Sequence, residues 1–491
     1  METTVALPTK EKKVVENISK STWKCPEFKV SGAFSSHMVL QRDREIVVWG
    51  FSDTPGSTVS ASFMGEYAKA TVDSDNNWEL RFSPRRYEWE GQTMTINDDR
   101  GHKVTFDDIL IGDVWMIHGQ SNAALPLAPC LVLTPSVDFS ENDNFRVFTQ
   151  FQHIVYENQE LCNEPQCDVI RPEWCWKRPD EAASREFSAL GWYFAKKITS
   201  MTDIPLGLIV LAAGGACVRE YMPEDLAHSE GYTFGANVKE AGYFNTLVNP
   251  FLKLPFKAMI YFQGESEGIE RRFAERYAHD LAVLVADERA RFGFNFPFYN
   301  IQLSDYRAEG AQFFPFHDIV RTQQFDALKL IPNSTLTVDM DLGSPIDHDD
   351  WAHSPRKLEL AERVASLALA REYGIGSESE ANSPMPIYAR LEDEGRSIEI
   401  AFEHIHTGLI ASGHAPAESI DMEVNGFYVG AYDCRQKARA TITTRYTVKV
   451  EVPEGVEPTH VGYAMSTNIT PDDITLRNGA NLPCPAFVIK L

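Results

Sequence analysis

The alternation of apolar and polar residues divides the chain into three parts. In the first part, from Phe28 to Phe106, short alternating runs are separated by turn-forming stretches, which is typical of a β-sandwich-like module. Residues 1–24 precede this pattern and are expected to form an N-terminal tail. The strands expected in the module are Glu45–Trp49, Thr58–Phe63, Trp78–Phe82 and Thr93–Ile96.

From Ile109 onward, continuous apolar runs alternate with segments of helical periodicity. This order predicts an α/β fold in which helices cover both faces of a parallel sheet. Ser354 and Pro355 are expected to cap and open the last helix. The expected strands are Val114–Ile117, Leu206–Leu211, Ala258–Phe262, Phe298–Leu303 and Ser334–Asp339. The expected helices are Phe187–Thr199, Glu270–Arg291, Phe316–Leu328 and Pro355–Tyr373.

The third part is again rich in strand-like runs. Residues 376–384 are rich in serine and glutamate, which is typical of a linker. We therefore predict an N-terminal β domain (25–107), an α/β/α domain (108–375) and a C-terminal β domain (385–491). The strands expected in the last domain are Ser397–Phe402, Met422–Val424, Ala440–Thr443, Thr447–Val452 and Ala486–Lys490.

The acidic excess of the chain limits its partners. Seventy acidic against 46 basic residues give a formal net charge of −24, which repels phosphate backbones and anionic membrane surfaces. Nucleic acid and membranes are therefore not expected as partners. The first residues show no secretory signal pattern, so a cytoplasmic location is expected, or a secreted one if a signal has been removed. The eight cysteines lack the paired spacing of a zinc site, and we expect neither a metal nor a cofactor.

The first candidate for chemistry is GDVWMIHGQSN (112–122), a buried strand that ends in a polar turn. In open α/β folds, ligands bind at the carboxyl ends of the strands. Ser121 would lie there, where its hydroxyl is able to attack a carbonyl while its own amide stabilises the oxyanion. The alternative is a serine that only caps a helix.

The second candidate is DHDDWAHSPRK (347–357), which precedes the long last helix. A serine nucleophile needs a base, and the pKa of histidine suits that task near neutrality. Asp350 precedes His353 by three residues, so its carboxylate is able to fix the imidazole tautomer. Two alternatives remain: His348 as the base, and an acidic surface loop without catalytic role.

The third candidate is MIYFQGESE (259–267), again a strand that runs into a polar turn. The side-chain amide of Gln263 would donate toward an oxyanion, and Glu265 would orient neighbouring groups. Alternatively, the two side chains satisfy each other and the backbone. The occurrence of all three stretches at predicted strand ends favours catalysis.

Six motifs, in their order along the chain, resemble the sialate O-acetylesterase family of SGNH (GDSL-like) hydrolases. The closing YAMSTN (463–468) and LRNGANLPCPAFVI (476–489) extend the resemblance over nearly the whole chain. The six are HMVLQRDREIVVWGFSDTPGSTV (37–59), IGDVWMIHGQSN (111–122), FSALGWYFAKKI (187–198), IPLGLIVLAAGG (204–215), NTLVNPFLKLPFKAMIYFQGES (245–266) and the Asp350/His353 turn.

The resemblance implies a flavodoxin-like, three-layer catalytic domain with accessory β domains. It implies Ser121 as the nucleophile, with Asp350 and His353 as its partners. It also implies oxyanion donors at the Ser121 amide, a backbone amide of Gly214–Gly215, and Gln263. No metal or cofactor is implied, and the reaction is the removal of O-acetyl groups from carbohydrates through an acetyl-serine intermediate.

The sequence departs from the family pattern around the nucleophile and after the glycine pair. His118 replaces a small residue, and we expect it to be packed or hydrogen-bonded rather than catalytic. Arg219 lies in a replaced segment, where it either pairs with a sugar carboxylate or forms a salt bridge with Glu220. Trp351, Tyr221 and Phe262 either line a sugar pocket or pack in the core. The candidate substrate-binding residues are Gln120, Asn122, Arg219, Glu265 and Trp351.

We therefore expect an esterase that acts on an O-acetylated sugar or oligosaccharide through a Ser-His-Asp triad. Acetylated sialic acids and acetylated hemicellulose oligosaccharides are the competing substrates. A carbohydrate-binding protein that has lost turnover is the alternative from another class.

Overall fold

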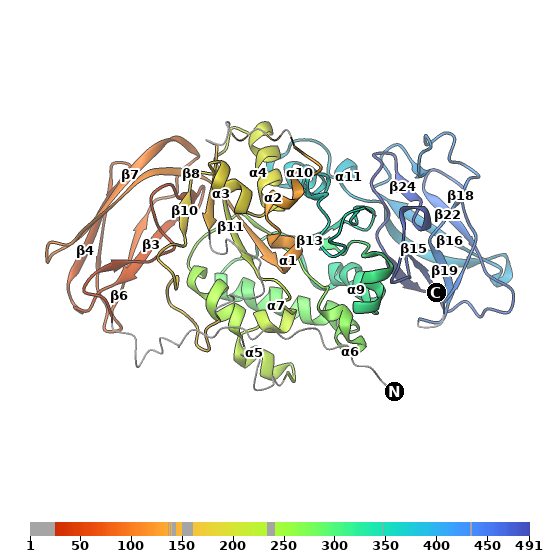
Figure 1. Ribbon diagram of the computed structural model, residues 1–491, viewed down its shortest axis with the longest axis horizontal. Coiled ribbons are helices and arrows are strands. Elements are labelled where there is room, and N and C mark those ends of the chain that lie inside the picture. Colours follow the sequence, from red (N-terminus) through yellow and green to blue (C-terminus); the bar gives the residue numbers. More distant parts are fainter. Residues whose placement is uncertain are drawn as a thin grey trace.

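The computed structural model describes residues 25–135, 137, 139, 144–149, 161–232, 241–345, 347–432 and 435–491. The expected tail, 1–24, lies outside these residues. In Figure 1, a β region in red and orange lies at one end, a β region in blue lies at the other, and the helices gather between them. None of the described helices combines the length and the hydrophobicity of a membrane-spanning segment.

The central sheet is built around β8 (Lys103–Gly119). Its parallel neighbours are β11 (Leu206–Ala212) and β12 (Ala258–Phe262). The order across the sheet is β10-β9-β11-β8-β12-β13-β14, with β9 at Phe145–Thr149, β10 at Cys175–Lys177, β13 at Phe298–Gln302 and β14 at Ser334–Val338. The predicted strands are present. The prediction of a parallel sheet is wrong at its edge, because β10 pairs antiparallel with β9.

Side chains of β8 show that helices cover both faces of this sheet. Trp115 packs on Phe194 of α4 (Ala189–Met201) and donates a hydrogen bond to Tyr373 of α10 (Lys357–Tyr373). His118 points the other way and reaches Glu288 of α7 (Tyr277–Phe292). The odd and even positions of β8 therefore face different helices, as strand alternation requires.

The predicted helices differ from expectation in their bounds or continuity. The helix expected over Phe187–Thr199 is α4, which begins and ends two residues later. The helix expected over 270–291 is divided into α6 (Arg271–Ala274) and α7, because the chain turns at residues 275–276. The last helix begins at Lys357, two residues later than expected, and Ser354 accepts a hydrogen bond from the backbone of Arg356 before the helix starts. The remaining helices are α1 (Ser121–Ala124), α2 (Leu127–Cys130), α3 (Glu181–Glu186), α5 (Glu224–Ser229), α8 (Arg307–Phe313), α9 (His317–Leu330) and α11 (Glu378–Ala381).

The N-terminal β region shares a strand with the central sheet. The first half of β8 pairs with β7 (Glu88–Asp98) and β2 (Val39–Gln41), and its second half lies between β11 and β12. Residues 107 and 108, the predicted domain boundary, lie within this one strand. The other strands are β1 (Lys29–Val30), β3 (Ile46–Phe51), β4 (Thr58–Phe63), β5 (Glu66–Thr71) and β6 (Asn77–Phe82).

The C-terminal β region packs against the central part through a shared apolar core. Phe325 of α9 and Leu336 and Val338 of β14 belong to the same buried cluster as its strands. The short helix α11 lies in the segment expected to be a linker. The strands are β15 (Met385–Glu392), β16 (Ser397–Glu403), β17 (Leu409–Ala411), β18 (Glu423–Val424), β19 (Phe427–Gly430), β20 (Arg435–Lys437), β21 (Ala440–Ile442), β22 (Thr447–Glu451), β23 (His460–Tyr463), β24 (Leu476–Asn478) and β25 (Phe487–Lys490).

Candidate active site

Ser121 is the first residue of α1, directly after the carboxyl end of β8. The turn before it is tight: Gly119 has a φ of +131°, and a Cβ there would lie 2.0 Å from the carbonyl oxygen of Phe262. The amide of Gln120 donates to that same carbonyl at 3.0 Å. Only glycine fits this close approach between β8 and β12. The turn therefore fixes Ser121, which is 3% exposed, between the ends of β11 and β12.

Asn122 connects the serine turn to the loop that carries the candidate base. Its Nδ2 donates to the carbonyl oxygen of Ala352 at 3.0 Å and to Oε1 of Glu265 at 2.7 Å. Its Oδ1 accepts a hydrogen bond from Nζ of Lys357 at 3.0 Å. The residue after Ser121 is thus bonded to the residue before His353.

Asp350 and His353 are paired. Nδ1 of His353 lies 2.8 Å from Oδ2 of Asp350, and Oδ1 of Asp350 accepts the backbone N–H groups of Ala352 and His353. Burial alone would raise the pKa of Asp350, but the hydrogen bond and charge of His353 lower it below its ordinary value. The carboxylate is therefore ionised and able to hold the imidazole in one tautomer. Within the described residues, Ser121 and His353 are not hydrogen-bonded to each other.

Among the residues that the structure describes, the alternative base His348 has no carboxylate partner of this kind. Its Nδ1 lies 3.1 Å from the backbone carbonyl oxygen of Asp350. A backbone carbonyl lacks the charge that would stabilise an imidazolium during proton transfer. The geometry favours His353.

Gln263 is fully buried, and its side-chain amide donates hydrogen bonds to other groups of the protein. Nε2 donates to Oε1 of Gln120 at 3.2 Å and to the carbonyl oxygen of Ala216 at 3.1 Å, and it also contacts Glu267. Gln120 in turn accepts the amide N–H of Gly264 at 3.3 Å. Gln263, which follows β12, is therefore hydrogen-bonded to the turns that follow β8 and β11.

Two buried glutamates support these turns. Burial raises the pKa of Glu265, whose Oε1 accepts hydrogen bonds from Asn122 and from the hydroxyl of Tyr306. Burial likewise raises the pKa of Glu267 to about 7, and its Oε1 accepts the amide N–H of Val218 at 2.7 Å. Gln263 and Glu265 therefore have separate partners and do not satisfy each other.

The segment after β11 contains the glycine pair and Arg219. Gly215 has a φ of +70°, and its carbonyl oxygen accepts the hydroxyl of Ser266 at 3.1 Å, which places the pair beside the turn after β12. The guanidinium of Arg219 lies 4.1 Å from the centre of the Phe273 ring. It forms no hydrogen bond or ion pair with any residue that the structure describes. Glu220 instead accepts the amide N–H of Cys217, so the salt bridge considered as an alternative is not formed.

The three aromatic candidates differ in their exposure to solvent. Tyr221 and Phe262 are 0% exposed and belong to the core, so a role in lining a sugar pocket is wrong for both. Trp351 is partly exposed. His118 is fully buried, hydrogen-bonded to Glu288 at 3.2 Å and packed on Tyr221, which confirms the expectation of a packed histidine.

Sequence reasoning missed Lys357 and Tyr306 as parts of this network. Lys357 is 1% exposed, although a lysine in the first turn of a helix is normally solvated. Only its place in the stretch 347–357, next to the candidate base, gave a signal. Tyr306 lies outside all three stretches, and no local pattern identifies it.

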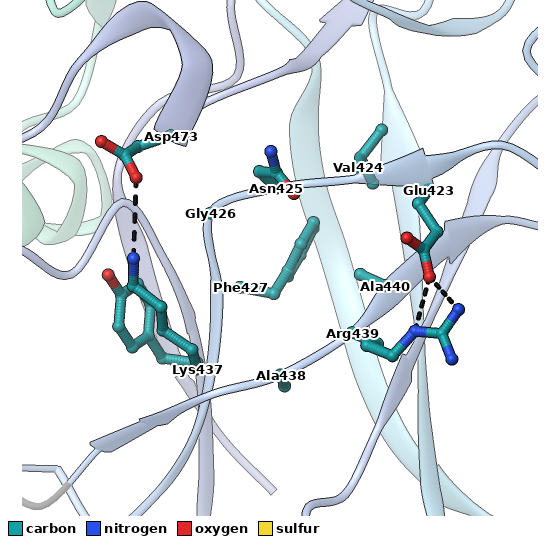
Figure 2. A pocket seen from close by; sticks show the side chains of 11 residues that line it. Glu423, Val424, Asn425, Gly426, Phe427, Lys437, Ala438, Arg439, Ala440 and Asp473 are labelled. Carbon is teal, nitrogen blue, oxygen red and sulfur yellow. Dashed lines mark hydrogen bonds and ion pairs between the residues drawn. The ribbon is translucent and has the colours of Figure 1, made fainter.

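A separate pocket of about 340 Å³ lies in the C-terminal β region, between β18, β19 and β20 (Figure 2). Figure 2 shows its charged side chains in pairs: Lys437 with Asp473, and Arg439 with Glu423. None of the candidate site residues lines it.

Comparison with known proteins identifies the class as carbohydrate esterase. A solved carbohydrate acetylesterase from Xanthomonas citri is 25% identical and superposes with a TM-score of 0.80, over 94% of this chain and 99% of that one. The family model described as carbohydrate esterase, sialic acid-specific acetylesterase matches residues 111–369, more than half of the chain. The chain belongs to this family and is an ester-hydrolysing enzyme.

Curated relatives agree with this assignment. The sialate O-acetylesterase of Mus musculus is 21% identical over 408 residues, which cover 71% of this chain and 74% of the relative. The sialate O-acetylesterase of Homo sapiens is 23% identical over 386 residues, which cover 71% of each chain. The substrate class of the family is an O-acetylated carbohydrate.

Proposed function

We propose that the protein removes O-acetyl groups from sugars through a triad of Ser121, His353 and Asp350. The observation that carries this proposal is the bond from Asn122 to Ala352, which joins the serine turn to a loop where His353 is already paired with Asp350. The proposal also requires a hydrogen bond between the serine hydroxyl and the imidazole in the enzyme–substrate complex. Such bonds are often long in ligand-free enzymes.

In the first half-reaction, His353 takes the proton of Ser121 while the serine oxygen attacks the acetyl carbonyl. The ester bond to the sugar then breaks, His353 returns the proton to the leaving sugar oxygen, and the acetyl group stays on Ser121. In the second half-reaction, His353 takes a proton from water, and the water oxygen attacks the acetyl carbonyl. Acetate leaves as the proton passes to Ser121.

We assign oxyanion stabilisation to the amide of Ser121, a backbone amide of Gly214–Gly215, and Gln263. In support, Ser121 follows β8 directly, and β8 lies between β11 and β12 in the sheet, so the turns after these three strands are neighbours. Gln263 must exchange one of its present acceptors, such as Gln120, for the oxyanion. We also propose that the central part is an SGNH-type, flavodoxin-like domain with β-sandwich-like domains at 25–107 and 385–491.

For the sugar, we propose a substrate with a carboxylate, such as an O-acetylated sialic acid, bound by Arg219. A partly buried guanidinium that stacks on Phe273 and lacks a described hydrogen-bonding partner is well suited to a carboxylate. The other candidates for substrate binding then contribute indirectly, through the hydrogen bonds that hold the turns after β8 and β12. These are Gln120, Asn122 and Glu265. The curated relatives named sialate O-acetylesterase support this choice over a neutral hemicellulose oligosaccharide.

The test is acetate release from acetylated sialic acids, xylo-oligosaccharides and manno-oligosaccharides, with the wild type and Ser121→Ala. Hydrolysis of any of them that disappears in Ser121→Ala supports the triad, whereas no hydrolysis above that variant supports a binding protein without turnover. Arg219→Ala should lower activity on sialic acids alone. The matched control is Arg271→Ala, an exposed arginine already paired with Glu275. Equal losses on neutral sugars would show that Arg219 is structural.

A further inference from the structure

An aromatic pair joins the loop that carries His353 to α8: Trp351 of the loop is partly exposed, and Phe313 of α8 is exposed. Phe313, the last residue of α8, is 39% exposed. Its ring stacks on Trp351, with ring centres 5.3 Å apart and planes inclined by 17°. Large aromatic side chains that remain in water at the rim of a site are typical of ligand-binding surfaces.

Neighbouring aromatic side chains hold Trp351 of this pair in place. Trp351 packs edge-on against Phe314 and Tyr306, with ring centres 5.9 and 6.5 Å away. Gly310 of α8 makes room for it, because a Cβ at this position would lie 3.1 Å from the Trp351 ring and 2.3 Å from Cβ of Tyr306. The aromatic surface is therefore preformed, which lowers the entropy lost when a ligand binds.

The same contacts connect the pair to the reaction centre. Trp351 lies between Asp350 and His353 in the chain. The hydroxyl of Tyr306, which backs Trp351, is hydrogen-bonded to Glu265 at 2.7 Å and lies 3.2 Å from Nδ2 of Asn122, the residue after Ser121. A ligand that packs on this aromatic pair therefore lies next to the loop that carries His353.

We propose that Phe313 and Trp351 form a platform for a pyranose ring next to the acetylated one in an oligosaccharide. This inference rests on the proposed function. A pyranose presents C–H groups on its flat face and hydroxyls around its edge, so the face packs on aromatic rings while the hydroxyls stay in water. Ser121 is buried and Phe313 is exposed, so the platform suits a ring outside the one that is attacked.

Binding to an inactive enzyme tests the platform separately from the triad. We would titrate Ser121→Ala with an oligosaccharide of three or more rings that ends in an O-acetylated sialic acid, and with the free O-acetylated sialic acid. Adding Phe313→Ala should weaken oligosaccharide binding about tenfold and leave the monosaccharide unchanged. The control is Ser121→Ala with Tyr67→Ala, which removes an exposed aromatic from β5 in the N-terminal β region.

Kinetics in the active enzyme give the second readout. Phe313→Ala should raise KM for the oligosaccharide about tenfold, with kcat and the hydrolysis of nitrophenyl acetate unchanged. Trp351→Phe keeps an aromatic ring and should retain most of the oligosaccharide affinity. Unchanged oligosaccharide binding in Phe313→Ala overturns the platform, and so does an equal loss with nitrophenyl acetate, since that loss would arise from the His353 loop. If the proposed triad is wrong and the platform is right, Ser121→Ala keeps its activity while Phe313→Ala still weakens oligosaccharide binding.

Discussion

Asn122 shows how one side chain positions two parts of the site. Its amide and carbonyl are bonded to Ala352, Glu265 and Lys357, so it connects the turn after β8 with the turn after β12 and the loop before α10. Two of these partners are ionisable groups in a buried environment. Hydrogen bonds of this type each contribute roughly 1.5–3 kcal/mol.

We expect Asn122→Ala to lower kcat by about 10- to 100-fold, because the loss of one such bond corresponds to one or two factors of ten in rate. KM for nitrophenyl acetate should change little, since Asn122 acts by positioning the His353 loop. Steady-state kinetics and thermal unfolding measure the two effects. The control is Asn468→Ala, at an exposed position in the C-terminal β region. A raised KM with kcat intact would contradict a positioning role.

Asp339 should make stability depend on pH. Burial raises its pKa to about 7, and its Oδ2 has no hydrogen-bonding partner among the described residues. Between pH 4 and 7 the native carboxyl keeps a proton that the unfolded chain has released, so stability falls as the pH rises. The loss is at most about 4 kcal/mol, at about 1.4 kcal/mol for each pKa unit.

Thermal unfolding of wild type and Asp339→Asn at pH 5 and pH 8 measures this effect. The fall in Tm from pH 5 to pH 8 should be smaller in the variant, because its side chain does not titrate. Asp326→Asn, a partly exposed aspartate paired with Lys329, is the control. An equal fall in both proteins would assign the pH dependence to other groups.

At the residue scale, local patterns predict Ser121, Asp350 and His353 as candidates, and the predicted pairing of Asp350 with His353 is present in the structure. Partners that are distant in the chain are not predicted. Lys357 could not be assigned to the same network, because its acceptor, Asn122, lies 235 positions earlier in the chain. Long-range contacts of this kind depend on the tertiary fold, which local spacing does not encode.

Among the elements, β8 matters most, because it delivers the serine and forms part of two β regions. Its end depends on Gly119, whose left-handed backbone allows Gln120 to bond the Phe262 carbonyl. We expect Gly119→Ala to lower kcat by at least tenfold and to destabilise the protein, since the added Cβ must displace the backbone of β12. Kinetics and thermal unfolding test this.

The control for that substitution is Gly101→Ala. Gly101 has a similar positive φ of 98°, but nothing lies within 4 Å of an added Cβ. The Gly101→Ala variant should lose stability from backbone strain alone and keep the kcat of the wild type. Equal kcat in both variants would mean that the close approach of β8 to β12 does not position Ser121.

Apolar runs predict five of the seven strands of the central sheet, because strands buried on both faces have a continuous signal. The strand β9 was not predicted. The full length of β8 was not predictable, since 103–108 alternates and 109–119 is continuously buried, and each half suggests a different element. The break between α6 and α7 was missed because helical periodicity continues across it. The antiparallel edge strand β10 spans three residues, too few for a pattern.

For the whole molecule, the C-terminal β region covers apolar surface of the central part. Phe325, Leu336, Val338 and Met340 are each at most 7% exposed and pack into the same cluster as its strands. Polar contacts join the two parts as well: Asp341 is paired with Arg363 of α10 and with Arg477 of β24, and Gln302 of β13 donates to the carbonyl oxygen of Ala486.

A chain that ends at residue 383 should therefore fail to fold into an active enzyme. Exposing four large apolar side chains costs about 6–12 kcal/mol at roughly 1.5–3 kcal/mol each, which equals the whole stability of a typical domain. We expect aggregation or noncooperative unfolding and no hydrolysis of nitrophenyl acetate. Co-expression of residues 385–491 should restore part of the soluble, active protein, because the interface is preserved. If the short chain alone unfolds at the Tm of the wild type and keeps its kcat, the C-terminal region does not stabilise the catalytic part.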